Sequence, residues 1–269
     1  MKDKRLNIDE VMALAIFGKS TPEIRRIDVD AFDRLYYQHP ELEAYIERAN
    51  SVLDRQEERG IVSLSCQDDD FPKRLLAIGD DCPAVIHCLG NVELLKEPKA
   101  VAIIGARSAD REGNDKAYQL GKEYAEKYAE KGYVVVSGLA LGCDASAHLG
   151  CLAAGGKTIA IVGSGLDIVH PRENTALQQQ ILENNGLILS EQVIGVKANP
   201  TRLVARNRLQ AALSEAVILA QCPAHSGSLH TMRFARQYRK QCFAATFPKR
   251  TEANAGNYNL LDNHLAKPL

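Results

Sequence analysis

Residues 134–148 read VVVSGLALGCDASAH, and this stretch decides the class of fold. The apolar run Val134–Val136 stops at Ser137 and Gly138, and a helix-like segment opens near Asp144. An uninterrupted apolar run is typical of a parallel strand that is covered on both faces. The small residues at its end predict either a tight turn or a turn whose backbone N–H groups approach a phosphate, with Asp144 capping the next helix.

The same apolar character recurs along the chain and alternates with segments of helical periodicity. Strands are expected at residues 84–89, 100–105, 133–138, 158–163, 187–191, 216–221 and 242–247. Helices are expected at residues 114–132, 144–156, 173–186, 202–215 and 227–241. This alternation implies right-handed βαβ crossovers, so we predict an α/β protein with a doubly wound, mostly parallel sheet.

Residues 1–65 have a different pattern, with apolar residues at helical intervals and no strand-like run. Asp30 is placed to cap one helix, and Gly60 is placed to end another. The period changes after Ile61, and the segment DDDFPKRLLAIGDDCPAVIHCLG (residues 68–90) looks like a linker that leads into the first strand. We therefore predict two domains, a small helical domain at 1–65 and a larger α/β domain at 66–269.

The composition narrows the class of protein. The 269 residues include 33 basic and 34 acidic residues, a net charge of -1, and there is no apolar run near the roughly 18 residues that span a bilayer. The N-terminus, MKDKRLNIDE, lacks the apolar region of a secretory signal, so we expect a cytoplasmic protein without a membrane partner. The seven cysteines never form a C-x-x-C pair, and no histidine pair has metal-ligand spacing beside a carboxylate. We expect buried reduced thiols, no metal and no cofactor.

The charge is unevenly distributed along the chain. Residues 197–250 contain ten basic residues and one acidic residue, Glu215, a net charge of +9, which leaves -10 for the remainder. Segregation on this scale favours an anionic partner for the C-terminal part.

Glycine, hydroxyl and arginine residues follow four of the expected strands. They are Gly105 to Ser108, Ser137 and Gly138, Gly163 to Gly165, and His225 to Ser228. Ligands of open α/β sheets bind outside the carboxyl ends of the strands, where glycine turns and helix N-termini offer backbone N–H groups to anions. No turn fits G-x-G-x-x-G or a P-loop, and Gly156-Lys157-Thr158 precedes a strand rather than opening a helix. The residues thus predict an anion-binding rim of no standard type.

Six segments, in order, resemble the bacterial DNA-processing protein DprA (Smf) family. They are VAIIGARSA, VVVSGLALGCDASAH, GGKTIAIVGSGLDIVHPREN, LILSE, RNRLQAALSEAVILAQ and SGSLHTMRFARQYRKQCFAATFP. The resemblance covers residues from about 70 to 262. It implies an extended Rossmann-like core behind a small helical domain, and a homodimer that binds single-stranded DNA. It also implies a role in protecting incoming DNA and in loading the RecA recombinase during natural transformation, with no enzymatic activity.

The resemblance also implies the residues of a DNA-binding site. Arg107 and Lys157 match motif positions that contact backbone phosphates. The other matching positions are Gly105, Ser137, Gly138, Gly163, Gly165, Arg206, Asn207, Arg208, Ser226, Gly227 and Ser228. A structural alternative is that Arg206 forms an ion pair with the acidic N-terminal half and that Asn207 forms a hydrogen bond within its helix. The apolar face of the last helix, with Leu229, Met232 and Phe234, is one candidate for the dimer contact.

The chain departs from the family pattern at several positions. Leu203 and Val204 stand where the family usually has Phe-Pro, so no aromatic side chain is available there for base stacking. Gln221 replaces an acid, and Lys249 replaces a glycine.

Two other classes of function remain open on the same fold. A nucleotide phosphoribohydrolase would need a glutamate in its late loop, and the comparable loop PAHSGSLHTMRFA has none. A nucleotide sensor would use the same rim for one small ligand. Neither His148 nor His225 has the base and orienting acid of a nucleophilic site, so we expect no catalytic residue.

Overall fold

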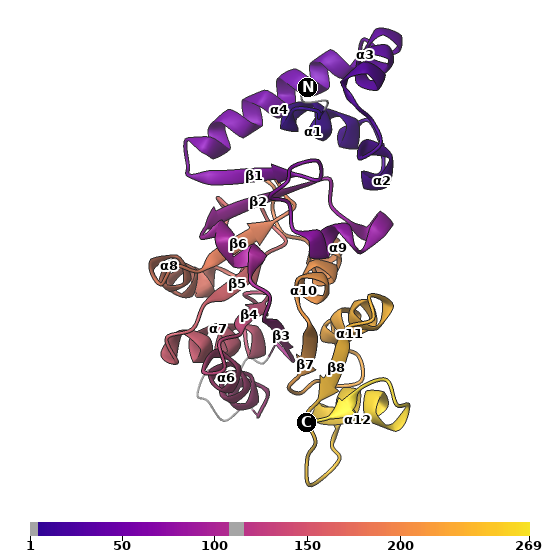
Figure 1. Ribbon diagram of the computed structural model, residues 1–269. Coiled ribbons are helices and arrows are strands. Elements are labelled where there is room, and N and C mark those ends of the chain that lie inside the picture. The colour runs from indigo at the N-terminus through magenta and orange to yellow at the C-terminus, as the bar shows by residue number, and fades with distance from the viewer. Residues whose placement is uncertain (1–4, 108–115) are drawn as a thin grey trace.

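The computed structural model describes residues 5–107 and 116–269, and these form a nine-stranded sheet flanked by helices (Figure 1). The strands are β1 (Ile61–Ser65), β2 (Val85–Gly90), β3 (Ala100–Ile104), β4 (Val134–Ser137), β5 (Thr158–Ile161), β6 (Leu187–Ser190), β7 (Ala216–Leu219), β8 (Gln241–Ala244) and β9 (Lys267–Pro268). Their order across the sheet is β1-β2-β6-β5-β4-β3-β7-β8-β9.

The chain winds the sheet in two directions from its middle. The strands from β3 to β6 follow one another outward on one side, and β7 returns to pair with the other side of β3. All pairs from β6 across to β9 are parallel, whereas β2 runs antiparallel to both β6 and β1. The predicted doubly wound, mostly parallel α/β fold is confirmed, and its direction of winding reverses between β3 and β7.

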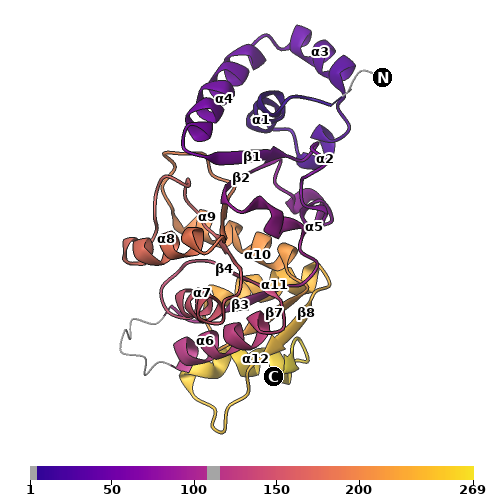
Figure 2. The same ribbon diagram turned by 60° about the vertical axis from the view of Figure 1, so that its left-hand side comes forward.

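Helices cover both faces of the sheet (Figures 1 and 2). One face packs on α6 (Lys116–Ala129), α7 (Cys143–Ala153) and α8 (Thr175–Glu183). The other face packs on α10 (Asn207–Leu213) and α11 (Ser228–Gln237). Burial on both faces explains why the central strands are continuous apolar runs.

The N-terminal region consists of short helices that lie over the β1 and β2 edge (Figure 1). They are α1 (Ile8–Ile16), α2 (Thr21–Ile24), α3 (Val29–Gln38) and α4 (Leu42–Glu57). The remaining helices are α5 (Lys73–Leu76), α9 (Pro200–Ala205), α12 (Ala255–Asp262) and the 3-10 turns η1 (Gly79–Asp81), η2 (Val92–Lys96), η3 (Arg172–Asn174) and η4 (Glu252–Asn254).

One glutamine ties the N-terminal helices to the sheet. Gln56 on α4 lies with its Nε2 3.0 Å from Ser63 Oγ and 3.0 Å from His87 Nδ1, and its Oε1 accepts the Ile194 N–H at 3.1 Å. The apolar residues of these helices share one core with the face of the sheet that α10 and α11 cover. The domain boundary at residue 65 stays a prediction, and the strand just before it, β1, pairs with β2 of the large sheet.

Local details differ from the sequence expectations. The edge strand β1 lies within residues 1–65, where the sequence predicts no strand, because its half-exposed residues lack an apolar run. The predicted linker contains α5 and η1. Asp28, rather than Asp30, caps α3 by accepting the Ala31 N–H at 2.9 Å. The helix expected at 202–215 is two helices, α9 and α10.

The cysteine prediction is confirmed, because all seven cysteines are free and buried. Burial raises the pKa of the Cys88 thiol to about 12, which keeps it protonated. No helix in the described ranges is long and apolar enough to cross a membrane.

Two buried histidines predict a loss of stability in mild acid. Burial lowers the pKa of His87 to about 4 and that of His148 to about 3. Below a pH of about 6.5, both histidines bind protons in the unfolded chain but stay neutral in the folded protein. The free energy of unfolding should therefore fall by up to about 1.4 kcal/mol per pH unit for each histidine.

Urea unfolding between pH 7 and 5.5 measures this slope. His87→Asn should make the slope shallower by about one histidine's share, whereas His264→Asn, at an exposed site, should leave it unchanged. Equal slopes in His87→Asn and the wild type would show that His87 titrates normally in the folded protein.

Candidate functional site

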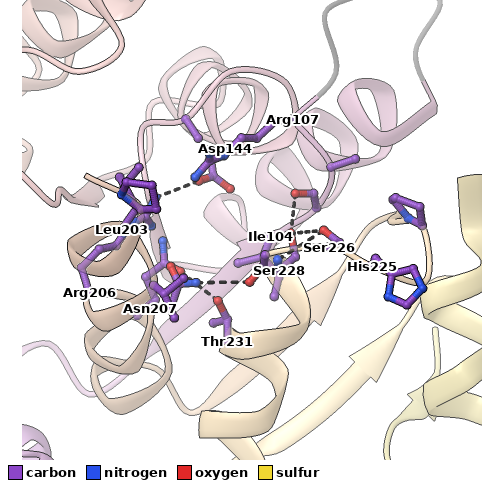
Figure 3. Close-up of a pocket in the computed structure, with 18 residues that line it drawn as sticks. Ile104, Arg107, Asp144, Leu203, Arg206, Asn207, His225, Ser226, Ser228 and Thr231 are labelled. Carbon is purple, nitrogen blue, oxygen red and sulfur yellow. Dashed lines mark hydrogen bonds and ion pairs between the residues drawn. The ribbon is translucent and has the colours of Figure 1, made fainter. Parts of the chain in front are cut away.

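A cavity of about 430 Å³ lies at the carboxyl ends of β3 and β7 (Figure 3). Its lining includes Gly105, Ala106 and Arg107 after β3, Pro223 and the loop from His225 to Ser228 after β7, Asp144 on α7, and Leu203, Val204, Arg206, Asn207 and Gln210 around α9 and α10. Neighbouring loops leave the sheet toward opposite faces at such a reversal, and the crevice between them is the usual ligand site of open α/β sheets. The volume lies in the roughly 300–1,000 Å³ range of small-ligand sites.

Arg107 is the exposed cation of this cavity. The turn that carries it is fixed on both sides, because the Ala106 N–H donates to Gln221 O at 2.8 Å and Ala106 O accepts the Cys143 N–H at 3.2 Å. A Cβ on Gly105 would lie 2.7 Å from Cys143 Sγ, so glycine lets α7 pack against this turn. The guanidinium of Arg107 has no ion pair with any residue that the structure describes.

Arg206 lies beneath the cavity and is 4% exposed. Its Nη2 donates to Gly138 O at 3.0 Å and lies 3.6 Å from Asp144 Oδ2. In the amide orientation that satisfies its neighbours, the Gln210 oxygen accepts the Gly138 N–H at 3.0 Å and also the Arg206 guanidinium. Burial acts to lower the pKa of Arg206, and the carboxylate of Asp144 opposes this effect. The guanidinium therefore joins α10, α7 and the turn after β4 from within.

This arrangement answers the question posed by the small residues after β4. A Cβ on Gly138 would overlap the Arg206 guanidinium. Ser137 is buried, and its Oγ donates to Ile103 O at 2.7 Å. The turn is small so that an arginine can approach its backbone, and the Gly138 N–H faces Gln210 rather than a ligand. Asp144 is not the helix cap, because it lies in the first turn of α7 after the N-cap Gly142.

The rest of the R-N-R motif also faces inward. Asn207 Nδ2 donates to Gly227 O at 3.3 Å and so holds the loop before α11, not its own helix. Arg208 makes a forked ion pair with Glu191, and its Nε donates to Asp81 O at 2.7 Å. Arg206 does form an ion pair, but its partner is Asp144 on α7 rather than an acid of the N-terminal half.

The loop from Ser226 to Ser228, here called the serine loop, follows β7 and lies on the opposite side of the cavity from α10 (Figure 3). Ser228 Oγ donates to Gly105 O, which ties the start of α11 to the end of β3. Ser226 Oγ accepts the Ser228 N–H at 3.3 Å. Gly227 is the N-cap residue of α11. The structure thus brings Ser226, Gly227 and Ser228 together with Gly105 and Arg107.

Lys157 lies away from this group. It precedes β5 and is therefore at the amino edge of the parallel strands, opposite the cavity. Its Nζ donates to Asn184 O at 2.8 Å, just after the end of α8, where a cation complements the helix dipole.

Gly163 and Gly165 are on the carboxyl edge but outside the cavity lining. A Cβ on Gly163 would come within 3.2 Å of the backbone of Arg202 and Leu203, so this glycine admits α9. The Gly165 N–H donates to Val196 O at 2.8 Å and is already used. These glycines serve close packing beside the rim.

Sequence reasoning missed several lining residues, among them Gln210, Thr231 and Pro200. Gln210 follows Arg206 by four residues, a helical spacing that places both on one face and could have identified it. Asp144 stood in the quoted motif but was interpreted as a cap.

In the folded protein, ion pairs neutralise part of the positive charge between residues 197 and 250. Three of the ten basic residues between 197 and 250 pair with acids outside that segment: Arg206 with Asp144, Arg208 with Glu191, and Arg250 with Asp262. The basic segment is therefore less free to attract an anion than its net charge suggests.

The buried Arg206 and Asp144 pair predicts a large stability effect. Asp144→Asn leaves the buried guanidinium without its counter-charge and should cost about 3–5 kcal/mol in the free energy of unfolding. Asp262→Asn, which removes the acid from an exposed pair, should cost about 1 kcal/mol or less. Urea unfolding of both variants at pH 7 measures the difference, and equal small reductions would contradict the role given to the buried pair.

Comparisons with known proteins agree with this architecture. The family model of DNA recombination-mediator protein A matches residues 63–269. The DNA processing protein DprA of Streptococcus pneumoniae is 37% identical over 203 residues, which are 76% of this chain and 69% of that protein. Protein Smf of Synechocystis sp. is 32% identical over 235 residues, which are 84% of this chain and 58% of that protein, so the chain spans little more than half of this relative. The names of the family and of the Streptococcus pneumoniae relative describe recombination mediation and DNA processing.

Solved structures show the same relationship. The X-ray structure of DprA from Streptococcus pneumoniae superposes with a TM-score of 0.70 at 29% identity, covering 98% of this chain and 90% of that one. A structure on the single-stranded DNA binding mode of DNA processing protein A from Helicobacter pylori superposes with a TM-score of 0.66 at 34% identity, covering 77% of this chain and 90% of that one. The Rossmann-like core and the resemblance seen in the sequence are confirmed, and the chain belongs to the DNA recombination-mediator protein A family.

Proposed function

We propose that this chain binds single-stranded DNA along the carboxyl edge of its sheet, with the cavity between β3 and β7 as the centre of the site. The Helicobacter pylori relative, whose structure concerns single-stranded DNA binding, supports the ligand class. The observation that carries the proposal is which arginines are exposed and which are already paired with an acid. Arg107 is exposed at the cavity, whereas Arg206 and Arg208 are held by Asp144 and Glu191.

Each group around the cavity has a distinct part in this proposal. Arg107 receives a backbone phosphate through its planar fork of N–H donors. The turn at Gly105 and the serine loop from Ser226 to Ser228 contribute hydroxyl groups and backbone near the same phosphate. Arg206 and Asn207 act from below by fixing the geometry of these loops. Lys157 and Arg208 are not part of the proposed contact surface, because Lys157 lies at the opposite edge and Arg208 is paired with Glu191.

A single strand suits this site better than a duplex. The polar groups lie in a recess between loops, and a flexible backbone can bend into it. Duplex DNA is usually read by a helix or strand pair that projects into a groove, whereas the groups proposed here line a recess.

We also propose the wider role that the family resemblance implies. The chain would protect incoming DNA and help load the RecA recombinase in natural transformation, acting in the cytoplasm as a homodimer. This role stays a proposal, because the chain spans 58% of one relative and 69% of another.

The structure leaves fewer residues of α11 available for a dimer contact than the sequence suggested. Met232 is wholly buried in the protein's own core and is removed from the candidate contact. Leu229 and Phe234 are partly buried and remain candidates.

Light scattering at micromolar concentration should give twice the mass of one chain, and Phe234→Asp should shift the protein toward monomer. A monomer in the wild type would remove the dimer from the proposal.

The site is tested by titrating a labelled oligo-dT with the protein and following fluorescence anisotropy. We expect the oligomer to bind more tightly than a duplex of the same length. Arg107→Ala should weaken binding at every sequence by a similar factor, because it removes a phosphate contact rather than a base contact. The slope of log affinity against log salt should become shallower by about 0.7, because one phosphate is no longer neutralised.

Arg236→Ala is the matched control, since Arg236 is exposed on α11 and outside the cavity lining. It should change affinity much less than Arg107→Ala. If Arg107→Ala stays folded and keeps the wild-type affinity and salt slope, the rim is not the DNA site. AMP as a competitor separates the alternatives, because a nucleotide sensor would bind it in preference to oligo-dT.

A further inference from the structure

A second cavity, here called the helix cavity, lies between the N-terminal helices and the sheet. Helices α1 and α4, which lie over the β1 and β2 edge (Figure 2), form one wall, and β2 with the loop after β6 forms the other. Its volume is about 440 Å³, and no described residue lines both this cavity and the one at β3 and β7. A whole small molecule fits this volume, because small-ligand sites measure roughly 300–1,000 Å³.

The walls of the helix cavity are mostly aliphatic. Met12, Ala49 and Val52 are buried, whereas Ala15 and Ile16 on α1 are exposed and mark its mouth. Ile16 is 48% exposed although its side chain is apolar. An apolar molecule in the cavity would remove these surfaces from water, and this burial favours binding.

His87, which is only 2% exposed, adds a hydrogen-bond donor to these aliphatic walls. The amide of Gln56 is fixed in orientation, because its Oε1 accepts the Ile194 N–H. Its Nε2 can therefore only donate, and His87 Nδ1, 3.0 Å away, must accept. The imidazole is neutral at pH 7, since burial lowers its pKa to about 4, so its proton is on Nε2. Nε2 has no hydrogen bond within residues 5–107 and 116–269 and is not sealed from solvent, which leaves its N–H for a ligand.

Arg48 supplies a cation at the mouth of the helix cavity. It is exposed and has no ion pair or hydrogen bond with another described residue. Glu191 also lines the cavity, but its carboxylate is already engaged in the forked pair with Arg208. Arg48 precedes Gln56 by about two turns of α4, so the cation lies roughly 12 Å along the helix from the donor beside Gln56.

We propose that the helix cavity binds a small amphipathic carboxylate, with the carboxylate on Arg48 and an oxygen at the far end of the chain accepting a hydrogen bond from His87 Nε2. The aliphatic walls between these two groups cover the chain of the ligand. The planar guanidinium fork matches a carboxylate, and one arginine balances its single charge. This site is separate from the proposed DNA site, and the inference does not rest on DNA binding.

Two acids that share a carboxylate test the contact with His87. Decanoate has an aliphatic chain of similar length to the separation of the two groups, and 9-oxodecanoate adds a ketone oxygen near the far end of that chain. We expect both to bind the wild-type protein in isothermal titration calorimetry. The ketone should bind about two- to tenfold more tightly, which corresponds to one added hydrogen bond. Changing the ligand avoids substituting His87, whose buried side chain contributes to the fold.

Two substitutions at exposed positions test where the acids bind. Arg48→Ala should weaken binding of both acids about two- to fivefold, as expected for one exposed ion pair. Arg34→Ala on α3 is its matched control, since Arg34 is exposed and outside the lining. Ala15→Trp should abolish binding, because the indole fills the mouth. Ala44→Trp, at an exposed position of α4 outside the lining, should bind as the wild type does. Circular dichroism checks that all four variants are folded.

Three results would overturn the inference. The first is that neither acid binds the wild-type protein at millimolar concentration, and the second is that the two acids bind equally well. The third is that folded Ala15→Trp binds them as tightly as the wild type, which would place the acids elsewhere on the protein. Oligo-dT binding is measured separately, so each of these results leaves the proposed function intact.

Discussion

The ion pair between Arg206 and Asp144 is the interaction on which the rest of the site depends. It is buried beneath the point where the sheet reverses its winding, and it joins α10, α7 and the turn after β4. A buried charge is tolerated only when it is paired and hydrogen-bonded, so this position constrains everything around it. Gly138 must be a glycine, and the loops above must follow the backbone that Arg206 holds.

The cavity follows from this constraint together with the topology. Doubly wound sheets open a crevice at the reversal of strand order, but the topology alone leaves its walls undefined. Here Asn207 holds the loop before α11, Ser228 ties that helix to β3, and Arg206 holds the opposite wall. The polar side chains under the cavity are thus occupied with each other, and Arg107 is left as the exposed cation above them.

The sequence predicted the layered fold because parallel strands that are buried on both faces are continuous apolar runs, which can be recognised in the sequence. It did not predict β1, since an antiparallel edge strand needs no such run. The sequence predicted that the turns after β3, β4, β5 and β7 lie on one edge of the sheet, which the parallel pairing shows, but it did not predict the partner of each glycine. Gly138 accommodates an arginine 68 residues later in the chain, a contact that only the tertiary structure specifies. Lys157 could have been placed from the sequence, because a residue that precedes a parallel strand lies at the opposite edge.

The central claim is that a DNA phosphate lies on Arg107 at the mouth of the cavity between β3 and β7. A crystal structure of the protein with a short oligo-dT tests this directly. We predict a phosphate within hydrogen-bonding distance of the Arg107 guanidinium and the strand lying along the carboxyl edge of the sheet. A strand bound on another face, with the cavity and Arg107 free of DNA, would contradict the claim.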